Sequence, residues 1–284
     1  MIKHFKKVIQ SIKSKGLGNT AKAVTDKLQF ESRYRITTMN LGLRLCFSKN
    51  AVIINHGKYK FNYYGGGDRG EILYHAFWDK MFLEELNTIN DFVKKGDTVI
   101  DVGGNLGFFV LILNELVGDS GKIYTFEPSK KLNQKLTSTV KINNLQNVSI
   151  VNLALGESEG STILHYNPKQ SGLSSIVTDL DSATTSEEIK ITTLNKFSTN
   201  FSDKISFIKI DTEGYEPQVL RGANELITRD KPIIYIELGG NHQKSSLEAL
   251  QVLKELDYNC EAENLDLKNV LAGVNFIATP KKNF

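Results

Sequence analysis

The stretch Thr98-Val-Ile-Asp-Val-Gly-Gly-Asn-Leu-Gly-Phe-Phe109 determines the fold expected for the whole chain. An apolar run ends at Gly103, and apolar residues then recur at helical spacing from Leu106 to Leu113. This pattern predicts a buried strand, a tight glycine turn and a helix. Glycines let a backbone approach a ligand closely, and a helix start offers unpaired N–H groups. The stretch therefore predicts a nucleotide or carboxylate site at the carboxyl edge of a parallel sheet.

The spacing of the glycines narrows the class of ligand. If Gly104 and Gly107 were the last two glycines of the dinucleotide pattern G-x-G-x-x-G, the first would fall on Val102, so that pattern fails. A phosphate-binding P-loop also fails, because no Gly-Lys-Ser/Thr follows. A buried carboxylate at the strand end, Asp101, would repel phosphate and suit a cationic ligand such as the amino group of S-adenosylmethionine. The alternative is a glycine-rich turn in another kind of α/β protein.

Length and composition limit the number of domains and the class of protein. A chain of 284 residues allows one large domain or one and a half, and 40% apolar with 24% charged residues is sufficient for a sizeable core. The net charge of +3 is too weak to argue for nucleic acid, so no nucleic-acid partner is expected. The two cysteines, Cys46 and Cys260, lack metal-ligand spacing and fit a reducing cytoplasm. No apolar run approaches the ~18 residues of a membrane span.

The N-terminal segment is basic and amphipathic. Residues 1–30 contain seven lysines and one acid, and no continuous apolar centre of a signal peptide. Four apolar residues share one helical face: Ile2, Phe5, Ile9 and Ile12. One interpretation is a solvated or packed helix. The other is peripheral contact of residues 2–15 with the anionic inner face of a membrane.

An alternation of strand and helix patterns organises the rest of the chain. Residues 43–62 predict two or three antiparallel strands, and residues 83–92 a helix leading into the organising strand. The domain boundary is expected between residues 92 and 93. Later strands are expected at 99–102, 122–126, 148–152, 205–211, 232–237 and 274–278. Helices are expected from 106, and at 129–142, 217–227 and 247–256.

The segment 155–200 is too long for a simple crossover between strands. Its two strand-like stretches, 161–166 and 188–192, predict an inserted hairpin over the sheet edge.

Acidic residues close four of the expected parallel strands: Asp101, Glu127, Asp211 and Glu237. The carboxyl ends of parallel strands line one crevice, so these side chains are expected to face a common site. Glu127 follows Gly107 by 20 residues, the distance at which a carboxylate takes up ribose hydroxyls. Proteins that bind NAD share that feature, and a helix cap before Pro128 is the alternative role of Glu127.

Four motifs in order resemble those of FkbM-type S-adenosylmethionine-dependent methyltransferases. They are Asp101-Val-Gly-Gly-Asn-Leu-Gly107, Phe126-Glu-Pro128, Asn152-Leu-Ala-Leu-Gly156 and Ile208-Lys-Ile-Asp-Thr-Glu-Gly-Tyr-Glu216. The resemblance covers roughly residues 93–279, and it departs mildly at Gly104, where the family more often has Ala. It implies an α/β, Rossmann-like sheet of seven strands with the last antiparallel, here carrying an N-terminal extension and the inserted hairpin.

The resemblance also implies a cofactor, S-adenosyl-L-methionine, and O-methylation of sugars or other hydroxylated compounds. The residues expected to bind the cofactor are Asp101, Gly103, Gly104, Asn105, Gly107, Glu127, Pro128, Asn152, Ala154 and Asp211.

The reaction requires a group that removes the acceptor's proton. Methyl transfer from a sulfonium is an in-line displacement, and an alcohol acceptor must lose its proton to a base or beside a metal. Asp211 is favoured as the base or acceptor-orienting group, with Glu213 and Glu237 beside it. The alternatives are that Asp211 only fixes the following turn, or that the three carboxylates hold a magnesium ion.

Two histidines and three aromatic residues are weaker candidates for the active site. His165 and His75 are alternative bases, because imidazole titrates in the right range, but surface or packing roles are expected for lone histidines. Tyr74, Phe77 and Trp78 are expected to pack in the core or a lid, with stacking of a sugar on Trp78 as the alternative.

Two other functions are weighed against an enzyme that methylates a glycan or glycolipid. A nucleotide-binding module without catalysis is disfavoured, because Asp101, Glu127 and Asp211 are intact. An NAD-dependent oxidoreductase or epimerase is disfavoured by Val102 and by the absence of a Tyr-x-x-x-Lys pair.

Overall fold

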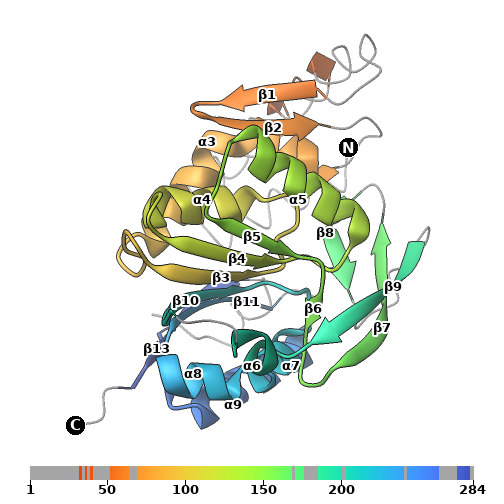
Figure 1. Cartoon of the computed structure of the whole chain (residues 1–284). Coiled ribbons are helices and arrows are strands. Elements are labelled where there is room, and N and C mark those ends of the chain that lie inside the picture. Colours follow the sequence, from red (N-terminus) through yellow and green to blue (C-terminus); the bar gives the residue numbers. More distant parts are fainter. Residues whose placement is uncertain are drawn as a thin grey trace, which may run out of the picture.

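The computed structural model describes most of the chain from residue 69 onward and a hairpin before it (Figure 1). The described residues are 32–33, 36, 39–40, 52–63, 69–167, 170–175, 185–199, 203–239, 242–261 and 274–281. The predicted membrane-contacting segment 2–15 lies outside these ranges. Within them, no helix has the length and apolar character needed to cross a membrane.

Seven of the described strands form one mixed sheet in the order β12-β13-β11-β10-β3-β4-β5. Their bounds are β3 Thr98–Val102, β4 Lys122–Phe126, β5 Val148–Val151, β10 Ile205–Ile210, β11 Ile233–Leu238, β12 Tyr258–Glu261 and β13 Val274–Pro280. The strands from β5 to β11 are parallel, whereas β13 is antiparallel to both of its neighbours. The predicted Rossmann-like sheet is confirmed, and β12 is the short strand that the sequence pattern did not reveal.

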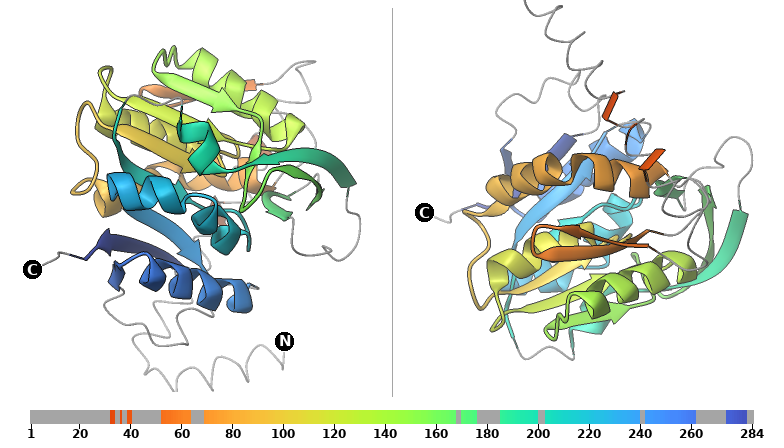
Figure 2. Two further views of the ribbon diagram at one scale, coloured as in Figure 1. Left: turned by 60° about the horizontal axis from the view of Figure 1, so that its bottom comes forward. Right: turned by 90° about the horizontal axis from the view of Figure 1, so that it is seen from above.

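Helices cover both faces of this sheet (Figures 1 and 2). One face carries α3 (Arg69–Ile89), α4 (Phe108–Val117) and α5 (Lys130–Ile142). The other carries α6 (Leu194–Ser198), α7 (Glu216–Arg221), α8 (Asn224–Asp230) and α9 (Gln243–Glu255). All five residues of β3 are buried, because helices pack on both sides of it.

Neighbouring residues of a strand therefore belong to different cores. Val99 and Phe207 pack with α4, whereas Ile100 and Ile208 pack with the helices of the opposite face.

Three helices differ from their expected bounds, and one of them is α9, which begins at Gln243 rather than near residue 247. Helix α3 begins at Arg69 rather than near residue 83, and a non-helical residue inside it, Phe77, interrupts the helical spacing on which the expectation depended. The single helix expected at 217–227 is two helices, α7 and α8. A β-carbon on Gly222 would lie 1.8 Å from the carbonyl oxygen of Gly156, so the chain between these helices runs directly against another backbone.

The N-terminal hairpin consists of β1 (Val52–His56) and β2 (Tyr59–Tyr63), which are antiparallel as predicted. Trp78 of α3 is 4% exposed, and its ring stacks on His56 and meets Phe108 edge-on. The packing role expected for Trp78 is confirmed, and the alternative of a sugar platform is wrong, because neighbouring rings cover the indole. The boundary between residues 92 and 93 stays a prediction.

The insertion is larger than the predicted hairpin. The two expected strands pair antiparallel as β7 (Gly160–Asn167) and β9 (Thr185–Thr192). They belong to a four-stranded sheet with β6 (Ala154–Leu155) and β8 (Gln170–Ser175) in the order β6-β9-β7-β8. This small sheet stands beside the carboxyl ends of β3, β4 and β5 (Figure 1).

Candidate functional site

A cavity of about 240 Å³ opens at the carboxyl ends of the central strands. Eight of the predicted site residues line it: Gly103, Asn105, Glu127, Pro128, Ala154, Asp211, Glu213 and Glu237. The apolar part of the lining includes Phe126, Leu153, Leu155 and Leu164, none of which was among the predicted site residues. Leu164 comes from the inserted sheet, so the insertion closes one side of the cavity.

The glycine turn after β3 brings two loops into contact. Gly103 has φ +86°, and a β-carbon there would lie 2.0 Å from the carbonyl oxygen of Asp211. β-Carbons on Gly104 and Gly107 would collide with Thr125 and Leu136 respectively. Gly104 and Gly107 do not line the cavity. Their role is to shape the turn, because the absence of a side chain lets β4 and α5 pack closely against it.

Glu127 follows β4 and is 4% exposed. Its Oε2 accepts the backbone N–H of Asn105 at 2.8 Å, and its Oε1 accepts that of Ser129 at 3.0 Å. Each oxygen retains room for a further donor, because an ionised carboxylate has about four acceptor positions. Burial raises the pKa of Glu127 to about 7, while the two N–H groups and Lys209 oppose that rise.

Asn152 is expected to bind the cofactor, but it does not line the cavity. It contacts the backbone next to the Glu127 carboxylate instead. Its side-chain amide donates to the carbonyl oxygens of Glu127 and Pro128 at 2.8 and 2.9 Å. Asn152 therefore holds the backbone that carries Glu127.

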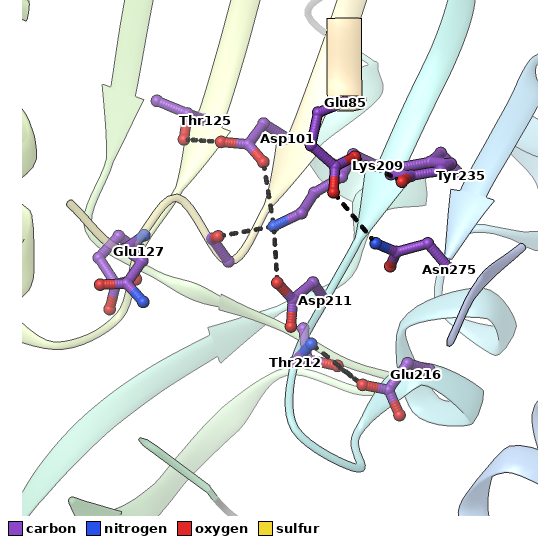
Figure 3. Close-up of polar contacts among 12 residues, drawn as sticks. Glu85, Asp101, Thr125, Glu127, Lys209, Asp211, Thr212, Glu216, Tyr235 and Asn275 are labelled. Carbon is purple, nitrogen blue, oxygen red and sulfur yellow. Dashed lines mark hydrogen bonds and ion pairs between the residues drawn. The ribbon is translucent and has the colours of Figure 1, made fainter. Parts of the chain in front are cut away.

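Asp101 is fully buried and does not line the cavity with the other strand-end acids. Its Oδ2 accepts a hydrogen bond from Thr125, and its Oδ1 lies 3.5 Å from the Nζ of Lys209 (Figure 3). The expectation that all four acids face one crevice is therefore wrong for Asp101. Asp101 and Lys209 are register partners on adjacent parallel strands, and their side chains meet on the same face of the sheet.

Carboxylates crowd the part of the cavity after β10 and β11. Repulsion from Asp211 is the largest cause that raises the pKa of Glu237 to about 8, followed by burial. Burial and then Asp211 raise the pKa of Glu213 to about 8. Among the described residues, no three His, Cys, Asp or Glu side chains are arranged to hold a metal ion. A cation placed among these carboxyl groups would lower their pKa values and stabilise their ionised forms, so the site suits a cationic ligand.

The turn after β10 is fixed by Glu216. Its Oε1 accepts the backbone N–H and the hydroxyl of Thr212 at 3.0 and 2.9 Å, and the N–H of Gly214 at 3.1 Å. Glu213 between them has φ +52°, a left-handed conformation that this carboxylate helps to hold. The turn-fixing role considered for Asp211 is therefore performed by Glu216, and the Asp211 carboxylate faces the cavity and Lys209.

Among the histidines whose side chains the structure describes, the one beside this site is His242, which the sequence did not suggest. The Nε2 of His242, at the start of α9, lies 3.8 Å from the Oε2 of Glu213. His165 alternates with the cavity-lining Leu164 on β7, so it faces away from the cavity. The side chain of His75 lies outside the described part of the structure.

Helix α3 contributes Glu85 to the same region. Glu85 accepts a hydrogen bond from the hydroxyl of Tyr235 at 2.5 Å, and its Oε1 lies 3.4 Å from the amide nitrogen of Asn275 (Figure 3). Burial raises the pKa of Glu85, and Lys209 opposes that rise. Asn275 is the register partner of Glu237, which places this polar group beside the cavity carboxylates.

Residues 101–260 match the model of the methyltransferase FkbM domain, which is more than half of the 284 residues. The chain is 35% identical over 69 residues to the protein-L-isoaspartate O-methyltransferase of Methanococcus aeolicus, covering 24% of this chain and 32% of that protein. It is 23% identical over 146 residues to methyltransferase 1 of Beauveria bassiana, covering 45% and 58%. The chain thus spans about a third and just over half of these relatives.

Among solved structures, the fold resembles the methyltransferase FkbM of Methylobacillus flagellatus. The TM-score is 0.46 at 15% identity, covering 73% of this chain and 52% of that chain.

Proposed function

The chain belongs to the FkbM methyltransferase domain family, and from this premise we propose that it transfers the methyl group of S-adenosylmethionine to a hydroxyl of a sugar, glycan or glycolipid. The observation that carries the proposal is the position of two acids on either side of the glycine turn. Glu127 follows β4 and Asp211 follows β10, the two neighbours of β3. One is suited to bind the cofactor, and the other to receive the acceptor's proton.

The cofactor fits the groups around the cavity. The free lone pairs of Glu127 suit the two ribose hydroxyls, which are hydrogen-bond donors. Phe126, Leu153 and Leu164 offer apolar surface for the adenine ring. Gly103, Asn105, Pro128, Ala154 and Asp211 would provide the remaining contacts. Asp101, Gly104, Gly107 and Asn152 would support them from behind.

The charge of the cavity separates S-adenosylmethionine from phosphate-bearing cofactors. Burial and then repulsion from Asp211 raise the pKa of Glu213 to about 8, and repulsion from Asp211 followed by burial does the same for Glu237. A sulfonium and an ammonium group would relieve this repulsion, whereas a pyrophosphate would increase it. The same reasoning disfavours NAD and the phosphates of a nucleic-acid acceptor.

Catalysis would depend on Asp211. When bound, S-adenosylmethionine supplies an electrophilic methyl carbon. Asp211 would orient the acceptor hydroxyl and take its proton as the new carbon–oxygen bond forms. Glu237, whose pKa is raised to about 8 mainly by Asp211, would donate a hydrogen bond to the Asp211 carboxylate and so help to orient it, and Glu213 lies beside them in the cavity lining.

A methyl-label transfer screen tests this function. The full chain would be incubated with methyl-labelled S-adenosylmethionine and, in separate reactions, with cell-surface glycans, glycolipids, protein and RNA. We expect label in a glycan or glycolipid fraction, bound through a base-stable ether. Label confined to RNA or protein would contradict the proposed acceptor but leave the cofactor assignment in place.

A further inference from the structure

Lys209 is a buried lysine in a strand whose other residues are apolar except for Ser206. It stands between Ile208 and Ile210 of β10, and its side chain is 7% exposed. Its Nζ donates to the carbonyl oxygen of Gly103 at 2.9 Å and lies 3.2 Å from the Oδ2 of Asp211. Its third partner is the Oδ1 of Asp101 at 3.5 Å. One ammonium therefore joins three chain segments directly behind the cavity (Figure 3).

We propose that Lys209 is the positioning residue of the active site, which sets the glycine turn and the Asp211 carboxylate in one fixed relation. This inference rests on the proposed cofactor site and adds a role for a residue outside the cavity lining.

Several contacts hold the ammonium group of Lys209 in one position. Thr125 fixes the Asp101 carboxylate from the far side, and Asp101 in turn fixes the ammonium. The ring of Phe109 lies 5.5 Å from the same nitrogen, within the range of a cation–π contact. Held in this way, the ammonium also reaches the carbonyl oxygen of Gly103 and the carboxylate of Asp211. A displacement of Lys209 would therefore move the cofactor turn and the proposed base together.

The charge of Lys209 acts on the same groups. The ionisable side chains that face this region are Glu85 of α3, Asp101 of β3, Glu127 after β4, Asp211 and Glu213 after β10, and Tyr235 and Glu237 of β11. Lys209 lowers the pKa of Asp101, Glu85, Glu127, Glu213 and Glu237, in each case against the effect of burial or of neighbouring acids. Within the described structure, no lysine or arginine lines the cavity to replace it.

Lys209 could affect function simply by stabilising the fold, and the experiment must distinguish this role from positioning. Lys209 and Asp101 form a buried ion pair, and removal of one partner alone leaves an uncompensated buried charge that destabilises any fold. A loss of function in Lys209→Met alone would therefore not discriminate. The double substitution Asp101→Asn with Lys209→Met removes both charges, so it restores neutrality without restoring the contacts to Gly103 and Asp211.

The test is the affinity for S-adenosylmethionine as a function of pH, measured by calorimetry on the full chain. We expect the double variant to melt near the wild-type temperature but to bind the cofactor about ten- to a hundredfold more weakly, the usual effect of losing a charge-assisted hydrogen bond. The inflection of its pH–affinity profile should move upward, because Lys209 affects the pKa values of the neighbouring carboxyls more than Asp101 does.

Two further variants keep the result decisive. Lys209→Arg keeps the charge but cannot place one nitrogen against all three partners, so we expect weaker binding with a near-wild-type pH inflection. Lys122→Met removes an exposed lysine that pairs with Asp203 and should change neither quantity. If the double variant does not fold, Lys209→Arg alone decides.

Wild-type affinity and pH profile in the double variant, or wild-type affinity in Lys209→Arg, would overturn the positioning role. If the wild-type protein itself does not bind S-adenosylmethionine, the proposed function fails instead.

Discussion

Gly103 and Asp211, 108 positions apart in the chain, approach so closely that a β-carbon on Gly103 would lie 2.0 Å from the carbonyl oxygen of Asp211. This contact joins the turn proposed to hold the cofactor to the segment proposed to bind the acceptor. A side chain at position 103 therefore does not simply fill ligand space. It forces the two segments apart.

Gly103→Ala should lose both stability and cofactor binding. The left-handed conformation alone costs about 1–2 kcal/mol for a non-glycine residue, and the backbone collision adds to it. Gly57→Ala is the control, because Gly57 also has a positive φ, +59°, and its β-carbon would meet no atom within 4 Å. Thermal melts of both variants, each with and without S-adenosylmethionine, check this. Equal melting temperatures and equal stabilisation by the cofactor would contradict the expected collision.

Much of the fold follows from patterns that are local in sequence. The strand β3 and its turn could be predicted because a fully buried strand reads as an apolar run and the turn requires glycine. The start of α3 could not, because the non-helical Phe77 breaks the spacing that marks a helix. The break at Gly222 was equally hidden, because it depends on contact with the distant Gly156.

The site was predictable to the extent that it depends on strand ends. Glu127, Asp211 and Glu237 line one cavity, as expected from parallel topology. The pairing of Asp101 with Lys209 depends on the register between β3 and β10, which the sequence does not reveal. The available signal was Lys209 itself, a lysine inside the apolar strand Ile205–Ile210, which indicates a buried partner.

Glu127→Gln should weaken binding of S-adenosylmethionine about ten- to a hundredfold, because the amide group loses the charge and brings a donor toward the N–H of Asn105 or Ser129. Calorimetric titration measures the effect. Glu159→Gln, which changes an exposed carboxylate paired with Lys196, is the control and should bind normally. Unchanged affinity in Glu127→Gln would mean that the ribose lies elsewhere.

The free protein should become less stable as the pH rises from about 5 to 9. Glu127, Glu213 and Glu237 have folded-state pKa values of about 7, 8 and 8, raised above the ordinary value of about 4.3. The folded state then binds more protons than the unfolded state in this window, so the free energy of unfolding falls with pH. Urea titrations at pH 5.5, 7.0 and 8.5 measure it.

Glu237→Gln should reduce this slope, whereas Glu159→Gln should leave it unchanged. A free energy of unfolding that rises between pH 5.5 and 8.5 would contradict the raised pKa values.

Asp211→Asn should lower turnover by about 10² to 10⁴ while the melting temperature stays close to that of the wild type, because Glu216 and not Asp211 fixes the turn. The assay is methyl-label transfer to whichever fraction the wild type labels. Glu216→Gln is the contrasting variant and should lose stability. Near-wild-type turnover in a folded Asp211→Asn protein would end the role of Asp211 as base and direct attention to His242.

We propose that the cavity between Glu127 and Asp211 binds a sulfonium cofactor. Calorimetric titration of the full chain with S-adenosylmethionine, and separately with NAD, tests it most directly. We predict saturable binding of S-adenosylmethionine at least about tenfold tighter than any binding of NAD, a difference of about 1.4 kcal/mol. Tighter binding of NAD, or no binding of S-adenosylmethionine by the folded protein, would contradict it.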